Sequence, residues 1–87
     1  MQAALPKNWN VLENRLCRRF EFLNFVEAFS FMTAVALEAE KANHHPDWRN
    51  VYNTLEISLC THDAGNTITN KDYDLANKIN SILDKKN

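Results

Sequence analysis

Residues 16–42 read LCRRFEFLNFVEAFSFMTAVALEAEKA, and the period of the apolar residues changes within this stretch. At its start, Leu16, Phe20 and Phe22 share one parity, which is the alternation typical of a half-buried strand. Arg18 is the exception on that apolar face. Further along, the apolar residues recur at helical spacing instead. The stretch therefore predicts a strand that is followed almost at once by a long helix.

The predicted helix has a defined beginning and end. Asn24 is its expected N-cap, and Glu27 lies at the third helical position, where an acidic side chain complements the helix N-terminus. The pattern ends near Ala42, and Pro46 then disfavours helical geometry at His45. The expected inner face consists of Phe25, Ala28, Phe29, Met32, Val35, Ala36 and Ala39, and Phe31 and Leu37 widen it toward a second contact surface.

Shorter patterns on both sides supply the remaining elements. Residues 9–12 form a short strand, and Glu13 and Asn14 form the turn of a hairpin, because Asn tolerates positive φ. Two further strands are predicted at residues 48–52 and 54–60, followed by a loop over residues 61–68 with the only glycine. A last helix opens with Thr69-Asn-Lys-Asp72 and has an inner stripe of Leu75, Ala76, Ile79, Ile82 and Leu83.

The order strand, strand, helix, strand, strand, helix predicts an α+β fold. Its expected architecture is a four-stranded antiparallel sheet with the helices packed on one face. With 87 residues, of which 45% are hydrophobic, the chain is long enough for one core. We therefore expect a single domain over residues 1–87, whose small core favours association into an oligomer.

Charge and cysteine content exclude several classes of protein. Ten basic residues oppose eleven acidic ones, and this balance argues against a nucleic-acid module that works through bulk positive charge. Cys17 and Cys60 form no CxxC pair, so we expect two half-buried thiols, with a single bridge between them as the alternative. The first ten residues lack the pattern of a signal peptide, and no apolar run approaches the roughly 18 residues of a membrane helix. A cytoplasmic location without membrane contact is expected.

The three histidines are the first signal of chemistry. His44 and His45 follow the long helix, and His62 follows the last strand, so all three lie at element ends held by a rigid scaffold. An imidazole titrates near neutral pH and both donates and accepts protons. Glu40 lies one helical turn before His44, where it is suited to orient an imidazole or hold a cationic one.

Other interpretations of these residues stay open at this point. Three histidines also suit a metal ion, but no carboxylate–His–x–x–His spacing supports that interpretation, so no metal and no cofactor is expected. Asp72 is either the acidic residue of a helix N-terminus or a member of the site. Trp48 and Tyr52 are either aromatic residues of the sheet or walls of a pocket for a flat ring.

Several spaced blocks together resemble a known family. In chain order, Glu40-Lys-Ala-Asn-His44-His45-Pro46-Asp-Trp48, Asn50-Val-Tyr-Asn53, Thr61-His-Asp-Ala-Gly65 and Asp72 are similar to the signature of the pterin-4a-carbinolamine dehydratases. The family is also known as dimerization cofactors of hepatocyte nuclear factor. The likeness extends upstream through aromatic positions such as Trp9 and Phe20 and covers residues 9–83.

The resemblance implies a fold and an activity. The family fold is a four-stranded antiparallel sheet with helices on one face. Its members dehydrate 4a-hydroxytetrahydropterin to quinonoid dihydropterin and water, in the recycling of tetrahydrobiopterin, with no metal or redox cofactor. Longer members carry a helix before the first strand, which we expect to be absent here. The loop between Gly65 and Asp72 is one residue longer than in the animal proteins.

The resemblance also implies a role for each candidate residue. His44 and His62 would protonate the departing hydroxyl, and His45 would bind the pterin and assist as a base. Glu40 and Asp72 would support the histidines or contact the substrate, and Trp48 would be a pocket wall or lie behind one. The expected partners are the pterin and further copies of the chain, as a homodimer or homotetramer, without direct nucleic-acid contact.

Two alternatives to the enzyme remain from the sequence. The first is a non-catalytic scaffold that joins a helical partner, as the animal coactivator does. The second is a pterin-binding protein of another pterin pathway, which would keep the pocket without turning over the carbinolamine.

Overall fold

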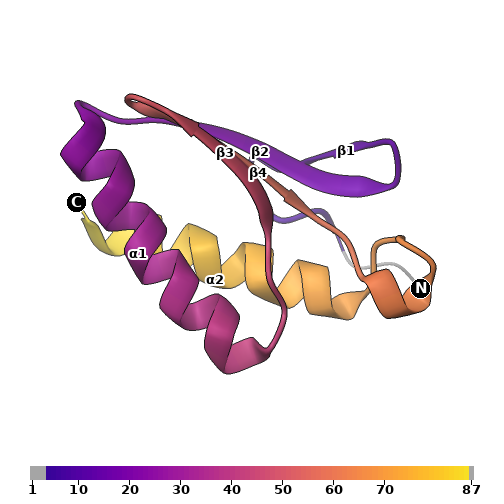
Figure 1. The fold of residues 1–87 in the computed structure, drawn as a ribbon. Coiled ribbons are helices and arrows are strands. Elements are labelled where there is room, and N and C mark those ends of the chain that lie inside the picture. The colour runs from indigo at the N-terminus through magenta and orange to yellow at the C-terminus, as the bar shows by residue number, and fades with distance from the viewer. Residues whose placement is uncertain (1–3, 87) are drawn as a thin grey trace.

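The computed structural model describes residues 4–86, which form one layer of sheet and one layer of helices (Figure 1). The four strands pair antiparallel in the spatial order β1-β2-β4-β3, and both helices cover the same face. The predicted fold class and element order are confirmed. The elements are β1 (Asn10–Leu12), β2 (Arg15–Glu21), α1 (Phe25–Ala42), β3 (Asp47–Val51), β4 (Thr54–Leu59), the short 3₁₀ turn η1 (His62–Ala64) and α2 (Asn70–Lys86).

Each predicted strand is present, with its ends moved by a residue or so. Glu13 and Asn14 both have positive φ, of 50° and 61°, and make the tight β1–β2 turn as predicted. Residues 4–9, which precede β1 in the described chain, contain a turn and no helix. The first three residues lie outside the described part, so the expected absence of a leading helix is tested only from residue 4 onward.

Strand β2 carries the alternation that its sequence predicts. Leu16 and Phe20 are buried under the helices, and Arg18 lies on the same face. The Arg18 guanidinium lies 4.5 Å from the centre of the Phe20 ring and donates to the side-chain oxygen of Asn80 on α2 at 2.6 Å. Burial lowers the pKa of Arg18, and the nearby Asp84 carboxylate partly opposes this effect.

Helix α1 begins as predicted, but its buried face differs from the expected one. The Asn24 side chain accepts from the Glu27 N–H at 2.9 Å and so caps the helix. Of the expected inner face, Ala28, Val35 and Ala39 are buried, whereas Phe25, Phe29 and Ala36 are exposed. Phe31, expected to widen that face, lies in the core at 1% exposure. The expectation was wrong at the exposed positions because two adjacent stripes of α1 are apolar, and the position of the sheet and α2 decides which one is buried. The buried stripe is Ala28, Phe31, Val35 and Ala39.

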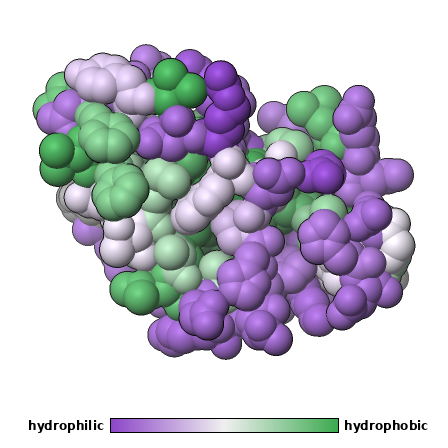
Figure 2. All heavy atoms as spheres, viewed as in Figure 1, coloured by the Kyte–Doolittle hydropathy of each residue, from purple (hydrophilic) through white to green (hydrophobic). Residues whose placement is uncertain are grey.

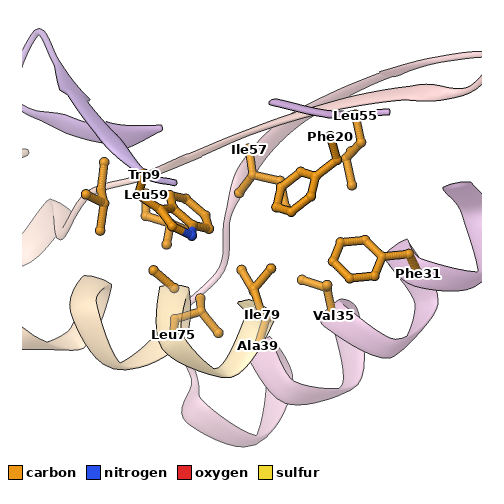
Figure 3. Packing of buried hydrophobic residues seen from close by; sticks show 12 residues of the cluster. Trp9, Phe20, Phe31, Val35, Ala39, Leu55, Ile57, Leu59, Leu75 and Ile79 are labelled. Carbon is orange, nitrogen blue, oxygen red and sulfur yellow. The ribbon is translucent and has the colours of Figure 1, made fainter. Parts of the chain in front are cut away.

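The core lies between the two layers (Figure 3). Phe20 of β2 and Phe31 of α1 meet there with ring centroids 5.1 Å apart. Trp9 closes one side of the core, and its indole N–H donates to the Asn80 side-chain oxygen at 2.9 Å. The Asn80 amide group in turn donates to the Lys7 carbonyl at 3.1 Å. This asparagine therefore ties the segment before β1 to α2.

The surface has an apolar end and a polar end. Figure 2 shows apolar atoms over the first turns of α1 and hydrophilic atoms around η1 and the start of α2. Both cysteines are free thiols: Cys17 is half-buried and Cys60 is fully buried. No helix within the described residues is long and apolar enough to cross a membrane. The exposed apolar residues around α1 are Leu23, Phe25, Val26, Phe29 and Leu37, here called the α1 outer patch.

Candidate active site

A pocket of about 310 Å³ lies where the end of α1, the end of β4 and the start of α2 meet. All three histidines line it, although they come from two segments of the chain. The sequence-predicted gathering of His44, His45 and His62 is therefore present as geometry. The other residues around this pocket are Asn43, Pro46, Asp47, Thr61, Asp63 and Lys71.

The end of α1 sets the position of His44. Asn43 adopts the left-handed conformation with φ of 51° and donates its N–H to the Glu40 carbonyl at 3.1 Å. The His44 N–H donates to the Ala39 carbonyl, also at 3.1 Å. These two bonds form a Schellman motif, which satisfies the last helix carbonyls and reverses the chain direction. His44 thus leaves the helix at a fixed angle.

The His44 ring is held by a buried carboxylate. Its Nε2 lies 2.5 Å from Oδ1 of Asp72, whose side chain is fully buried, and the imidazole itself is 11% exposed. A carboxylate accepts only, so Nε2 carries the proton of this bond. The remaining ring nitrogen of His44 is Nδ1, which is the atom left for a ligand.

Asp72 is itself fixed by two further hydrogen bonds. Its Oδ2 accepts from the Thr61 hydroxyl at 2.8 Å and from the Thr69 N–H at 2.9 Å. The Thr69 bond is half of the capping box that the sequence predicts. Asp72 thus caps α2 with one oxygen, as one of its two interpretations predicts, and contacts His44 with the other, while its part in a functional site stays a prediction. A buried carboxylate with full hydrogen bonding keeps a single orientation.

His45 and Glu40 form a second, more exposed pair. His45 Nε2 lies 2.9 Å from Glu40 Oε1, and the two side chains are 59% and 79% exposed. Glu40 therefore contacts an imidazole. This imidazole is that of His45 and not that of His44, which lies one helical turn after Glu40. Because both side chains are in water, this pair contributes little to stability.

His62 is the first residue of η1 and directly follows Thr61, two residues beyond the end of β4. Its Nδ1 is 2.7 Å from the side-chain oxygen of Asn66. An amide oxygen accepts, so the proton lies on Nδ1 and Nε2 is left for the pocket. Each of the three imidazoles thus has one nitrogen bound to a protein oxygen and one nitrogen free of that bond.

Trp48, like Glu40 and Asp72, does not line this pocket, and unlike them it has no hydrogen bond to one of the histidines. It is half-buried, pairs with Ile57 across β3 and β4, and packs against the hydrophobic core. Its role in the site therefore stays a prediction. The sequence pattern assigns no role to Thr61 or Asn66 as contacts of the site, although Thr61 opens one of the blocks that resemble the family.

Across residues 4–86, no group of three or more His, Cys, Asp or Glu side chains is arranged to hold a metal ion. The pocket instead presents three imidazoles, each with one nitrogen bonded to an oxygen of the protein. What this arrangement offers chemically is proton donation and acceptance at neighbouring points.

A family model described as pterin 4 alpha carbinolamine dehydratase matches residues 1–82. The chain belongs to this family. The match spans the four strands, α1 and all of α2 except its last residues. The resemblance seen in the sequence is thereby confirmed at the level of the family.

Individual relatives agree with the family match. The chain is 54% identical over 77 residues to a protein of Prochlorococcus marinus subsp. pastoris, covering 88% of this chain and 79% of that one. It is 50% identical over 84 residues to one of Solibacter usitatus, covering 94% and 87%. Both relatives carry names that assign them to pterin-4-alpha-carbinolamine dehydratase.

A solved structure shares the fold. It is described as a transcriptional coactivator/pterin dehydratase from Brucella melitensis, and it superposes with a TM-score of 0.83 at 39% identity. The superposition covers 88% of this chain and 83% of that one. The two-layer arrangement of sheet and helices is thus the family fold.

Proposed function

We propose that this protein dehydrates a 4a-hydroxytetrahydropterin to quinonoid dihydropterin and water, in the recycling of tetrahydrobiopterin. The observation that carries the proposal is that His44, His45 and His62 line one and the same pocket, with His44 bound to a fully buried Asp72. Family membership and the names of the relatives support the same activity.

The reaction needs two proton transfers and no net oxidation. The oxygen on C4a leaves as water only if it is protonated, and the C4a–O bond breaks as a ring-nitrogen lone pair forms the new C=N bond. A ring N–H proton then passes to a base. One acid and one base therefore balance the reaction, so it requires neither a redox cofactor nor a metal.

His44 is suited to be an acid at the departing hydroxyl. Since Nε2 is bonded to Asp72, the transferred proton would leave from Nδ1. The buried carboxylate of Asp72 pairs with the imidazolium and fixes the orientation of the ring, so proton donation requires no rotation of the His44 side chain. The leaving oxygen takes only one proton, and His62, on the other segment of the pocket, is proposed as the second acid able to supply it.

His45 is proposed to bind the pterin and to assist as the base. Its exposed ring and its bond to Glu40 leave Nδ1 available toward the pocket. A pair on the surface holds its geometry less firmly than the buried His44–Asp72 pair. We therefore assign the more demanding step, protonation of the leaving oxygen, to His44.

A kinetic assay tests the activity directly. The carbinolamine is generated in place by a pterin-dependent aromatic amino-acid hydroxylase, and its dehydration is followed by absorbance with and without this protein. A rate well above the spontaneous one supports the proposal. A rate equal to the spontaneous one contradicts it.

A second role is favoured by one observation. The α1 outer patch leaves several large apolar side chains in water, including Val26 at 70% and Phe29 at 54% exposure. We propose that it joins copies of this chain into a homodimer or homotetramer, in a reducing cytoplasm compatible with two free thiols. A non-catalytic scaffold would use the same patch but would not need the histidine pocket, so the kinetic assay separates the two.

A further inference from the structure

We propose that Asn66 is a positioning residue for the dehydration and acts through His62. It holds the ring proton of His62 on Nδ1, so that Nε2 is the atom that exchanges a proton with the substrate. This inference rests on the proposed function and assigns a role to a residue outside the three-histidine set.

The contact itself is short and specific. His62 Nδ1 lies 2.7 Å from Asn66 Oδ1, which is a strong hydrogen-bond distance between a ring N–H and an amide oxygen. His62 is exposed, and a free imidazole at such a place rotates about two bonds. Asn66 is exposed as well, so the bond restricts that freedom without abolishing it, and it also favours one of the two neutral tautomers.

The loop backbone presents the Asn66 side chain for this contact. Asn66 has a φ of 59°, a left-handed conformation that Asn adopts more readily than most residues. Its N–H donates to the Thr61 carbonyl at 3.1 Å, and the Gly65 N–H donates to the His62 carbonyl at the same distance. The loop closes where the Thr61 N–H donates to the Thr67 carbonyl at 2.8 Å. The loop that carries His62 is thus tied to itself at several points.

The two proposed acids would then work through opposite ring nitrogens. Asp72 occupies Nε2 of His44 and leaves Nδ1, whereas Asn66 occupies Nδ1 of His62 and leaves Nε2. Thr61 joins the two arrangements, because its hydroxyl donates to Asp72 and its carbonyl accepts from Asn66. A single strand-end residue therefore fixes the supports of both imidazoles.

The tautomer of His62 is the direct test. Nitrogen NMR of the full chain, labelled with ¹⁵N-histidine, distinguishes a protonated Nδ1 from a protonated Nε2. We expect His62 of the wild type to carry its neutral-form proton on Nδ1. In Asn66→Gly, which accepts positive φ without strain, we expect the proton to move to Nε2, the nitrogen that a free histidine favours. Asn66→Asp keeps an acceptor oxygen and should restore Nδ1–H.

Kinetics then connect the tautomer to the reaction. Asn66→Gly should lower kcat about tenfold with little change in KM, since loss of a supporting contact to a proton-transfer group removes part of its contribution. The matched control is Asn14→Gly, which replaces another left-handed asparagine, in the β1–β2 turn and outside the pocket lining, and should leave kcat unchanged.

The outcomes separate this inference from the function on which it rests. If the wild type does not accelerate dehydration, the proposed function fails, and the role of Asn66 in that reaction fails with it. If the wild type is active but His62 has the same tautomer in Asn66→Gly, the inference alone is overturned. An altered tautomer with unchanged kcat overturns it as well.

Discussion

Nε2 of His44 lies 2.5 Å from Oδ1 of Asp72, and the carboxylate is fully buried while the imidazole reaches the pocket. The two residues are 28 positions apart, one just past the end of α1 and the other in the first turn of α2. The start of one helix thus supports a side chain at the end of the other. The proposed acid of the reaction depends on this contact between helices.

Asp72→Asn should therefore reduce activity far more than it alters the fold. An amide has the shape of the carboxylate but cannot pair with an imidazolium, so we expect kcat to fall by about 10–100-fold. Loss of a charged hydrogen bond should lower the free energy of unfolding by about 1–3 kcal/mol. Asp74→Asn, an exposed residue of the same helix, is the control and should behave as wild type. A kcat for Asp72→Asn within twofold of wild type would show that the carboxylate has no part in the reaction.

Glu40→Gln should have a small effect, because Glu40 and His45 are 79% and 59% exposed. Gln keeps an acceptor oxygen, and an exposed pair contributes less than about 1 kcal/mol. We expect a free energy of unfolding within about 0.5 kcal/mol of wild type in urea, and a rise in KM with kcat nearly preserved. A tenfold loss of kcat would instead place the Glu40–His45 pair in the proton-transfer step.

Asn80→Ala tests the polar contacts that the Asn80 side chain makes at the side of the core closed by Trp9. The Asn80 side chain binds the indole N–H of Trp9, the guanidinium of Arg18 and the Lys7 carbonyl. Its removal leaves the 3%-exposed Trp9 without that acceptor, so the free energy of unfolding should fall by about 1–3 kcal/mol. Urea titration followed by tryptophan fluorescence measures this, with exposed Asn77→Ala as the control. Equal stability of the two variants would mean that water replaces these contacts without cost.

Phe29→Glu tests self-association through the α1 outer patch. Phe29 is 54% exposed and forms a ring contact with Phe25 at 5.8 Å between centroids. For the wild type, light scattering should give a mass that is a multiple of the 10.1 kDa chain, and a charge in an apolar interface should lower it. Ser30→Glu, at the next position on α1, places the same charge beside the patch as a control. A 10.1 kDa wild type would contradict the proposed assembly.

Much of the fold could be predicted from the sequence because the signals are local. The change of period between Phe22 and Phe25 marks the strand and the helix, and the caps at Asn24 and Thr69 are set by residues three positions away. The histidines could be placed at element ends for the same reason. The Schellman motif at Asn43 then places His44 in the pocket.

The remaining features depend on contacts between distant segments. Both Phe29 and Phe31 are apolar and helical, and only the position of the sheet decides that Phe31 is buried. The pairing of His44 with Asp72 rather than with Glu40 depends on where α2 begins in space. A hydroxyl such as that of Thr61 has no sequence pattern that would mark it as a support of the site.

The dehydration rate of the His44→Ala/His62→Ala double variant decides whether these two histidines are the acids of the reaction. We expect the wild type to accelerate carbinolamine dehydration and the double variant to lose most of this acceleration, by about 100-fold or more, since general acid catalysis contributes on that scale. Circular dichroism of the variant should remain that of the wild type, because neither ring lies in the core. A natively folded double variant that retains wild-type activity would contradict the assignment of these histidines as the acids.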